Sequence, residues 1–263
     1  MEDDGFQMYQ SKKKRRLPMK IPTKSQCKNV IQHPSQATES RIEASLKQAK
    51  EHLERTGLMA KTMHFLEKIL DGRTLRAAKA IGIGNFGDRP TSNGSLQMAL
   101  FMEIKEQLRP LKASCQDPVM NPTEVQFLQK AGVEVPELND LSSPDVDLQH
   151  DNEVVLFFMP HCGHALYNNI LWSNWGPMLL KNLVIVGNDF KKMVILEKHE
   201  DEIEALLKYR EIADFLNFPV NGEDAFSDTS IMSFSGELLP EVGKEKPVYD
   251  HFAPELVINK SSL

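Results

Sequence analysis

Two short apolar runs, at residues 154–159 and 183–186, have the length and the β-branched or aromatic character of strands buried on both faces. Between them, Leu166, Ile170 and Leu171 are spaced as on one side of a helix. A strand, helix, strand unit pairs its strands in parallel, and such folds bind ligands beyond the carboxyl ends of the strands. The polar and glycine residues that follow each run are therefore predicted to lie at one edge of a sheet.

The same alternation of strands and helices extends to both sides of this unit. Three further strands are expected upstream, near residues 77–81, 111–116 and 133–135. A helix with apolar residues four apart follows the first, and a helix that opens with the capping residues Asn121 and Glu124 follows the second. A late strand is expected at residues 231–234. The pattern predicts an α/β fold, namely a three-layer, Rossmann-like domain with a mostly parallel sheet, at residues 73–242.

Residues 41–72, before this domain, are expected to form two amphipathic helices. Apolar residues recur at steps of four, three and four on either side of Gly57, where the helical phase breaks. These helices would cover the sheet or its edge; the alternative is an arm that binds a partner protein. Residues 1–40 lack apolar periodicity and are predicted to be a disordered basic tail, and residues 243–263 a loosely held C-terminal tail.

Charge is distributed unevenly along the chain. Residues 1–30 hold eight Lys and Arg against three acidic residues, a net charge of +5, so the remainder carries −11 within the total of −6. An acidic core repels phosphate backbones, which argues against nucleic-acid binding outside the tail. A run of five basic residues in the tail is typical of a nuclear import signal or an electrostatic arm, with a merely solvated segment as the alternative. The run consists of Lys12, Lys13, Lys14, Arg15 and Arg16.

Hydropathy and cysteine usage indicate where the protein resides. No apolar run approaches the roughly 18 residues of a transmembrane helix, so no membrane association is expected. The three cysteines are scattered through the sequence, as in proteins of a reducing compartment. We expect a cytoplasmic protein, with a nuclear fraction if the basic run is an import signal.

Polar and glycine residues follow four of the expected strands directly. The candidate ligand-binding residues of this group are Gly82, Gly84, Asn85, Asp117, His161, Cys162, Gly187 and Asn188. A Gly-rich turn before a helix lets a ligand approach the backbone, and the helix N-terminus favours anionic groups. The alternative is that these glycines only make a tight turn. Asp117 stands where nucleotide-binding folds bind a ribose hydroxyl, and an Asp-Pro turn is the alternative interpretation. A small-molecule ligand, nucleotide-like in character, is the expected occupant of this edge.

The helix that follows His161 is unusually rich in asparagine. Asn168, Asn169 and Asn174 join the candidate set, because Asn is a poor residue in a helix interior; these amides either cap backbone groups or line the site. A structural metal is not expected, since the cysteines and histidines lack the spacing of a zinc site. A Cys-His nucleophile pair requires the chain to turn at Cys162, because neighbours on a strand point to opposite faces. His164 is expected at the surface.

Several motifs of this sequence resemble one known family. The stretch MPHCxxALYNNxLWxNW, followed by LVIVGN, is similar to the core of the "sensitivity to red light reduced" (SRR) domain family. The resemblance extends to GIGNF at residues 82–86, to DPxxxPTExxxLxxxG at 117–132 and to FSDTSIMSF at 226–234, so it covers roughly residues 76–236. One departure is Asp189, where many relatives have a serine.

The resemblance implies a regulatory protein. It suggests a role in circadian rhythm and clock-gene expression, in light signalling and in the regulation of haem biosynthesis, with protein partners that are not identified. It implies no established catalytic activity, and it makes haem a second candidate for the cofactor. It also carries over His161 and Cys162, but not His164. The alternative is an enzyme, methyltransferase-like, that uses a nucleoside cofactor in the strand-end cleft, and a third hypothesis is an interaction module formed by the helices at residues 41–70.

Overall fold

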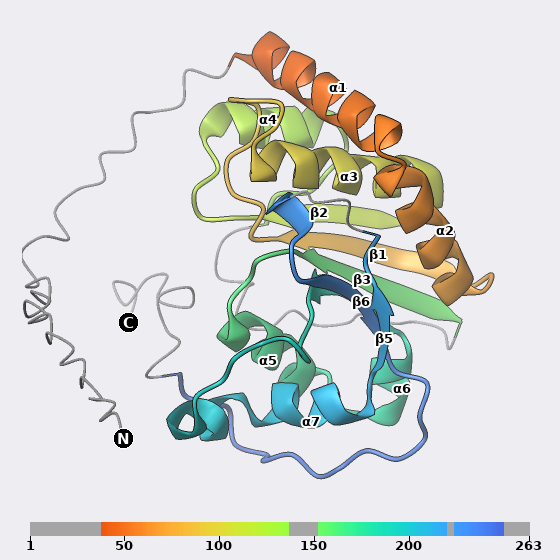
Figure 1. The fold of residues 1–263 in the computed structure, drawn as a ribbon, viewed down its shortest axis with the longest axis vertical. Helices are drawn as coiled ribbons and strands as arrows, with labels where there is room; N and C mark the ends of the chain where they lie inside the picture. The colour runs from red at the N-terminus through yellow and green to blue at the C-terminus, as the bar shows by residue number, and fades with distance from the viewer. Residues whose placement is uncertain (1–37, 137–151, 220–223, 250–263) are drawn as a thin grey trace, which may run out of the picture. The chain divides into compact units, whose positions relative to one another are not determined.

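The computed structural model describes residues 38–136, 152–219 and 224–249, which form one mixed sheet with helices on both faces (Figure 1). The strands are β1 (Thr74–Ile81), β2 (Lys112–Gln116), β3 (Glu153–Met159), β4 (Leu183–Asn188), β5 (Asp214–Asn217) and β6 (Thr229–Ser233). Their order across the sheet is β2-β1-β3-β4-β6-β5. The first four are parallel, whereas β6 runs antiparallel to both β4 and β5. The predicted α/β class with a mostly parallel sheet is confirmed.

The helices form two layers, one on each face of the sheet (Figure 1). One layer contains α1 (Glu39–Arg55), α2 (Leu58–Leu70), α3 (Asn93–Leu108) and α4 (Pro122–Lys130). The other contains α5 (His164–Ser173), α6 (Pro177–Lys181) and α7 (Glu204–Ile212). Short 3₁₀ segments, η2 (Glu197–Ile203) and η3 (Asp224–Phe226), lie in the connections. Within the described ranges, no helix combines the length and hydropathy needed to cross a bilayer.

β3 lies between the two layers and joins their cores. All seven of its residues are buried. Leu156 and Phe158 belong to the hydrophobic cluster under α1–α4, whereas Val155 and Phe157 belong to the cluster under α5–α7. Side chains alternate across a strand, so a continuous apolar run is what a strand covered on both faces requires.

The order of the parallel strands fixes where a ligand can approach. β1 has β2 on one side and β3 on the other. The helix after β1 packs on one face, whereas the helix after β3 packs on the opposite face. The loops beyond β1 and β3 therefore diverge at the carboxyl edge, which is the switch point where open α/β sheets form a crevice.

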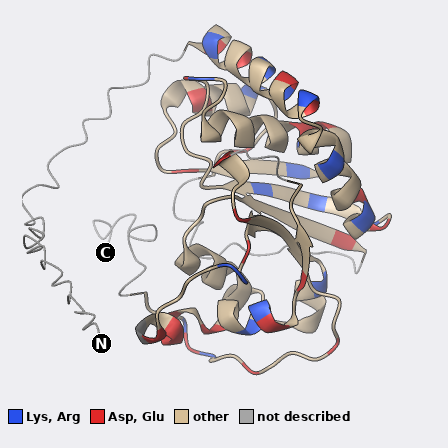
Figure 2. Ribbon diagram, viewed as in Figure 1, with Lys and Arg blue, Asp and Glu red and all other residues tan. Residues whose placement is uncertain are grey.

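α1 and α2 are the two helices expected from the apolar pattern, and Gly57 separates them with a φ of 71°. The apolar side of α1 packs on α3 within this chain, and Lys50 of α1 forms an ion pair of 2.7 Å with Glu103 of α3. Acidic and basic residues alternate along the rest of α1 (Figure 2). The buried face of α1 therefore packs on helices of its own layer rather than directly on the sheet that we expected these helices to cover.

Two sequence expectations need adjustment. The strand expected near residues 133–135 is reduced to one parallel bridge, between Ser114 of β2 and Glu134. The tail expected at residues 1–40 overlaps α1, which begins at Glu39; its first 37 residues, which include the basic run, lie outside the described residues.

Candidate functional site

A cleft of about 420 Å³ opens at the carboxyl ends of β1, β2 and β3. The candidate residues that line it are Gly82 and Gly84 after β1, Asp117 after β2, and His161 and Cys162 after β3. Its volume lies within the range of roughly 300–1,000 Å³ that is common for small-molecule sites. Sequence reasoning anticipated the convergence of these three strand ends, because parallel strands end at the same edge.

Gly82 and Gly84, the two glycines after β1, are favoured at their positions for different structural reasons. Gly82 has a φ of 71°, and a Cβ atom there would lie 2.6 Å from Cys162 Sγ, so its missing side chain lets β1 and the loop after β3 approach each other. Gly84 has a φ of 75° with open space around the position of a Cβ atom. Its dihedral angle, rather than packing, favours glycine.

Asp117 connects the ends of β1 and β2. Its carboxylate accepts hydrogen bonds from the backbone N–H of Gly84, at 2.7 Å, and of Val119, at 2.8 Å. The side chain lines the cleft while the residue is only 9% exposed. The turn at residues 117–119 and a ligand contact are thus compatible, because an ionised carboxylate has about four acceptor sites and two are used.

Glu124 is a second carboxylate that holds the Gly-rich loop. The expected capping box is present: the Asn121 side chain accepts from the N–H groups of residues 123 and 124, and Glu124 accepts from the N–H of Asn121 at 2.9 Å. Glu124 also accepts from Phe86 N–H, at 2.6 Å, and from Asn85 Nδ2, at 2.9 Å. Burial raises the pKa of Glu124, although these hydrogen bonds oppose the rise. Asn85 therefore supports the loop and does not line the cleft.

His161 begins a sharp turn after β3. Its φ is 60°, and its N–H donates to Asn188 Oδ1 at 2.6 Å. Its ring Nε2 lies 3.1 Å from the carbonyl oxygens of Asp224 and Ala225. Carbonyl oxygens only accept, so Nε2 carries a hydrogen and donates it to them.

Cys162 follows in this turn, but its thiol is directed away from a pairing with the His161 ring. Cys162 Sγ donates to the carbonyl oxygen of Ile81 at 3.3 Å and packs against Gly82. The chain does turn at this position, as a nucleophile pair would need. The thiol and the Nε2 of His161 nevertheless bind different backbone carbonyls, so the arrangement fits packing and loop closure.

Gly187 and Asn188 lie outside the cleft lining and support the turn from behind. Asn188 Nδ2 donates to the carbonyl oxygen of Cys162 at 3.2 Å, and Asn188 N–H donates to Tyr167 Oη at 2.9 Å. Tyr167 Oη in turn donates to the carbonyl of Met159. A Cβ atom on Gly187 would lie 2.5 Å from Tyr167 Oη, so glycine at this position lets the tyrosine reach the strand end.

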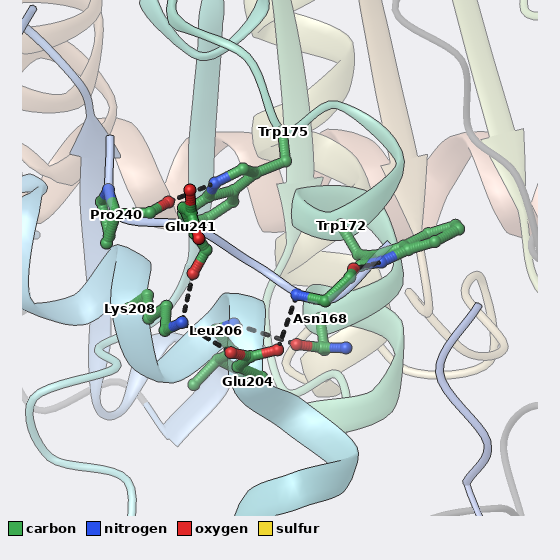
Figure 3. A network of polar contacts seen from close by, with 9 residues as sticks. Asn168, Trp172, Trp175, Glu204, Leu206, Lys208, Pro240 and Glu241 are labelled. Carbon is green, nitrogen blue, oxygen red and sulfur yellow. Dashed lines mark hydrogen bonds and ion pairs between the residues drawn. The ribbon is translucent and has the colours of Figure 1, made fainter. Parts of the chain in front are cut away.

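The asparagines of α5 fall outside the cleft lining. Asn168 Oδ1 accepts from Leu206 N–H at 2.9 Å, in the first turn of α7 (Figure 3). Asn168 Nδ2 donates to Tyr249 Oη at 2.9 Å. Asn174 Nδ2 donates to the Ile170 carbonyl at 2.8 Å, at the end of its own helix. Asn169 is buried as well. Of the two sequence interpretations, the amides of Asn168 and Asn174 follow the one in which they cap backbone groups.

Residues 240–243 are attached to α5 and α7 by a further set of contacts (Figure 3). Trp172 Nε1 donates to the Gly243 carbonyl at 2.8 Å, and Trp175 Nε1 donates to the Pro240 carbonyl at 3.0 Å. Glu204 Oε2 accepts from Gly243 N–H at 2.9 Å. The sequence predicts a loosely held tail from Gly243 onward, whereas the described part of it contacts both helices. The segment contributes backbone groups to these contacts, and backbone groups carry no sequence signal.

Other features of the described residues bear on metal and thiol chemistry. They contain no group of three or more His, Cys, Asp or Glu arranged to hold a metal ion. Burial, with the nearby charges of Asp117 and Glu124, raises the pKa of the Cys115 thiol well above its usual range. His164, expected at the surface, is half-buried, and burial lowers its pKa.

The fold and the cleft define a doubly covered α/β protein with a small-molecule-sized site at its strand ends. A family model described as the SRR1 domain matches residues 50–233, more than half of the chain, so the protein belongs to the SRR1 domain family. The family expected from the motifs is confirmed.

Three relatives illustrate the extent of the similarity. The chain is 37% identical to an SRR1-like protein of Mus musculus over 112 residues, 42% of this chain and 43% of that protein. It is 26% identical to an SRR1-like protein of Drosophila melanogaster over 206 residues, 76% of this chain and 70% of that protein. The Protein SENSITIVITY TO RED LIGHT REDUCED 1 of Arabidopsis thaliana is 28% identical over 123 residues, 47% of this chain and 43% of that protein. The match to the mouse and plant relatives thus spans less than half of their length.

Proposed function

We propose that this protein is a regulatory member of the SRR1 family whose α/β domain binds a small ligand in the strand-end cleft and acts on protein partners. The observation that supports the proposal is the cleft of about 420 Å³ at the carboxyl ends of three adjacent parallel strands. Open α/β sheets bind ligands at this position. We propose ligand binding and not catalysis, because a fold by itself does not imply a reaction.

The biological setting of the proposal comes from relatives. The plant relative is named for reduced sensitivity to red light. We propose that this chain acts in a related regulatory process, such as circadian rhythm, clock-gene expression or the regulation of haem biosynthesis. Haem is the less favoured ligand of the cleft, because both side chains suited to bind its iron there have backbone partners: Cys162 Sγ on Ile81, and His161 Nε2 on residues 224 and 225.

A second candidate function is an enzyme, methyltransferase-like, that uses a nucleoside cofactor. The observation that favours it is the buried Asp117 after the second strand, beside a Gly-rich turn. Conversion of the bound cofactor distinguishes the enzyme from the regulatory ligand-binding protein. After incubation with a methyl donor and cell extract, a regulator releases its ligand unchanged, whereas an enzyme yields the demethylated cofactor, which mass spectrometry detects.

Ligand binding in the cleft is tested by native mass spectrometry of the gently purified full chain. We expect a retained small molecule in the wild type and its loss in Val119→Trp, because Val119 lines the cleft and is 38% exposed, so that an indole ring there occupies space that the ligand needs. The matched control is Val194→Trp, at a residue that is 84% exposed and outside the cleft lining. A protein that retains no small molecule, or one that retains it equally in both variants, contradicts the proposal.

Localisation is a separate proposal. We propose that the five basic residues at 12–16 act as a nuclear import signal in a protein that otherwise resides in the cytoplasm. Replacing the five basic residues by alanine is expected to shift a fluorescent fusion towards the cytoplasm. The melting temperature is expected to stay the same, because a segment that the sequence predicts to be disordered buries no apolar surface. An unchanged distribution between nucleus and cytoplasm would count against an import signal.

A further inference from the structure

The Gly-rich loop after β1 differs from a phosphate-binding loop in one respect: three of its backbone N–H groups, at Gly84, Phe86 and Gly87, already have side-chain acceptors. Gly84 N–H donates to Asp117, Phe86 N–H to Glu124, and Gly87 N–H to Ser95 Oγ at 3.2 Å. Phosphate sites in such folds depend on free N–H groups of this turn and of the next helix. In α3, Ser95 N–H donates to Ser92 Oγ at 3.3 Å. A phosphate group would have to compete with two carboxylates for the N–H groups of Gly84 and Phe86.

The charge of the cleft also argues against a phosphate-bearing ligand. Among the described residues that line it, none is Lys or Arg, and Asp117 contributes a negative charge. Glu124 adds a second carboxyl group on the far side of the same loop. A phosphate brought to within a few ångströms of Asp117 would meet like charge without a compensating Lys or Arg in the lining. The charge of Asp117 thus opposes the anionic ligand that the sequence suggests for this helix N-terminus.

What the cleft offers instead is hydrogen-bond acceptors beside apolar walls. Each oxygen of the Asp117 carboxylate accepts one backbone N–H, so each retains a site for a further donor. Ligand hydroxyl groups are donors of the required kind, and an acidic residue after the second strand binds the ribose hydroxyls in nucleotide-binding α/β proteins. Ile83, Val119 and Leu166 supply apolar surface for a flat ring.

From these observations we infer that the ligand is a nucleoside-like molecule without phosphate, whose sugar hydroxyls donate to Asp117 while its base lies against Ile83, Val119 and Leu166. The inference rests on the proposed function, because it assumes that a small molecule occupies the cleft. It adds the chemical class of that molecule. A neutral or cationic nucleoside satisfies the cleft, whereas nucleotides and dinucleotides do not.

The test is isothermal titration calorimetry of the full chain with adenosine, guanosine, cytidine and uridine, each compared with its 5′-monophosphate and its 2′,3′-dideoxy form. At least one nucleoside is expected to bind, with its monophosphate weaker by on the order of tenfold or more because of the charge of Asp117. The dideoxy form is expected to be weaker by a similar factor, on the order of tenfold, because it lacks the donors for the carboxylate. These comparisons change the ligand and leave the folded protein untouched.

A charge-introducing variant gives the converse test. In Val119→Arg, the ratio of the nucleoside affinity to the monophosphate affinity is expected to fall by on the order of tenfold, because a guanidinium at the rim pairs with phosphate. The control Val194→Arg adds the same charge outside the cleft lining and should leave the ratio unchanged. A monophosphate that binds as tightly as its nucleoside, a dideoxy form that binds equally well, or four nucleosides without binding would each overturn the inference.

The outcomes also separate this inference from the proposed function. If no nucleoside binds but native mass spectrometry finds a small molecule that Val119→Trp removes, the cleft binds a ligand of another class. In that case the proposed function stands and the nucleoside assignment falls. If neither experiment detects a ligand, both fall.

Discussion

Gly94→Ala is expected to destabilise the protein by about 2 kcal/mol, although alanine is the better helix residue by about 1 kcal/mol. Gly94 lies in the first turn of α3. A Cβ atom there would lie 2.1 Å from the carbonyl oxygen of Asn85 and 3.0 Å from that of Ile83. Both are backbone atoms of the Gly-rich loop, so no side chain can rotate away. Either α3 or the loop has to shift, and overpacking of this kind outweighs the gain in helix propensity.

The change in the free energy of unfolding is measured by urea denaturation, with nucleoside or native-ligand binding as a second readout. The matched control is Gly176→Ala, because Gly176 has a φ of −169° and nothing within 4 Å of the position of a Cβ atom. It is expected to change stability by less than about 1 kcal/mol. A Gly94→Ala protein as stable as the wild type would show that α3 and the loop are not in rigid contact.

The elements of this fold were predictable from the sequence where one physical signal dominates. β3 is an unbroken apolar run, and burial against two clusters explains that pattern fully. α4 begins at the predicted capping box, and α1 and α2 separate at the predicted Gly57. The short segment near Val133 was harder to assign, because three residues with strand character do not determine whether a ladder or a single bridge forms.

The sheet order was less accessible. A strand pattern does not indicate its neighbours, and the antiparallel placement of β6 between β4 and β5 depends on pairings over long stretches of chain. The hydrogen-bonding character of the cleft could not be predicted from the sequence for a similar reason. Gly84 and Asp117 are 33 residues apart, and Phe86 and Glu124 are 38 apart, yet these pairs determine which N–H groups remain for a ligand. The glycines alone are compatible with a ligand-binding turn or with a plain tight turn, and the acceptors that the next strand and helix supply are visible only in the structure.

Glu124→Ala is expected to cost about 4 kcal/mol of stability, the largest single effect among these variants. The carboxylate is fully buried and accepts from three donors: the N–H groups of Phe86 and Asn121, and Nδ2 of Asn85. Each buried donor left without an acceptor costs about 1–3 kcal/mol, and water that enters the vacated space offsets part of the sum. Glu124→Gln keeps the volume and one acceptor oxygen but turns an NH₂ group towards a donor, so a cost of about 2 kcal/mol is expected.

Asn121→Ala is the control that separates loop support from helix capping. It removes the acceptor for the N–H groups of Thr123 and Glu124 without touching the Gly-rich loop, and loss of a cap costs about 1 kcal/mol. Hydrogen exchange at the Phe86 amide provides the local readout. It should accelerate in Glu124→Ala, because the amide loses its acceptor, and stay slow in Asn121→Ala. If Glu124→Ala costs no more than Asn121→Ala and the Phe86 amide remains protected, the carboxylate only caps α4, and the loop keeps its shape, with its N–H groups engaged, by other contacts.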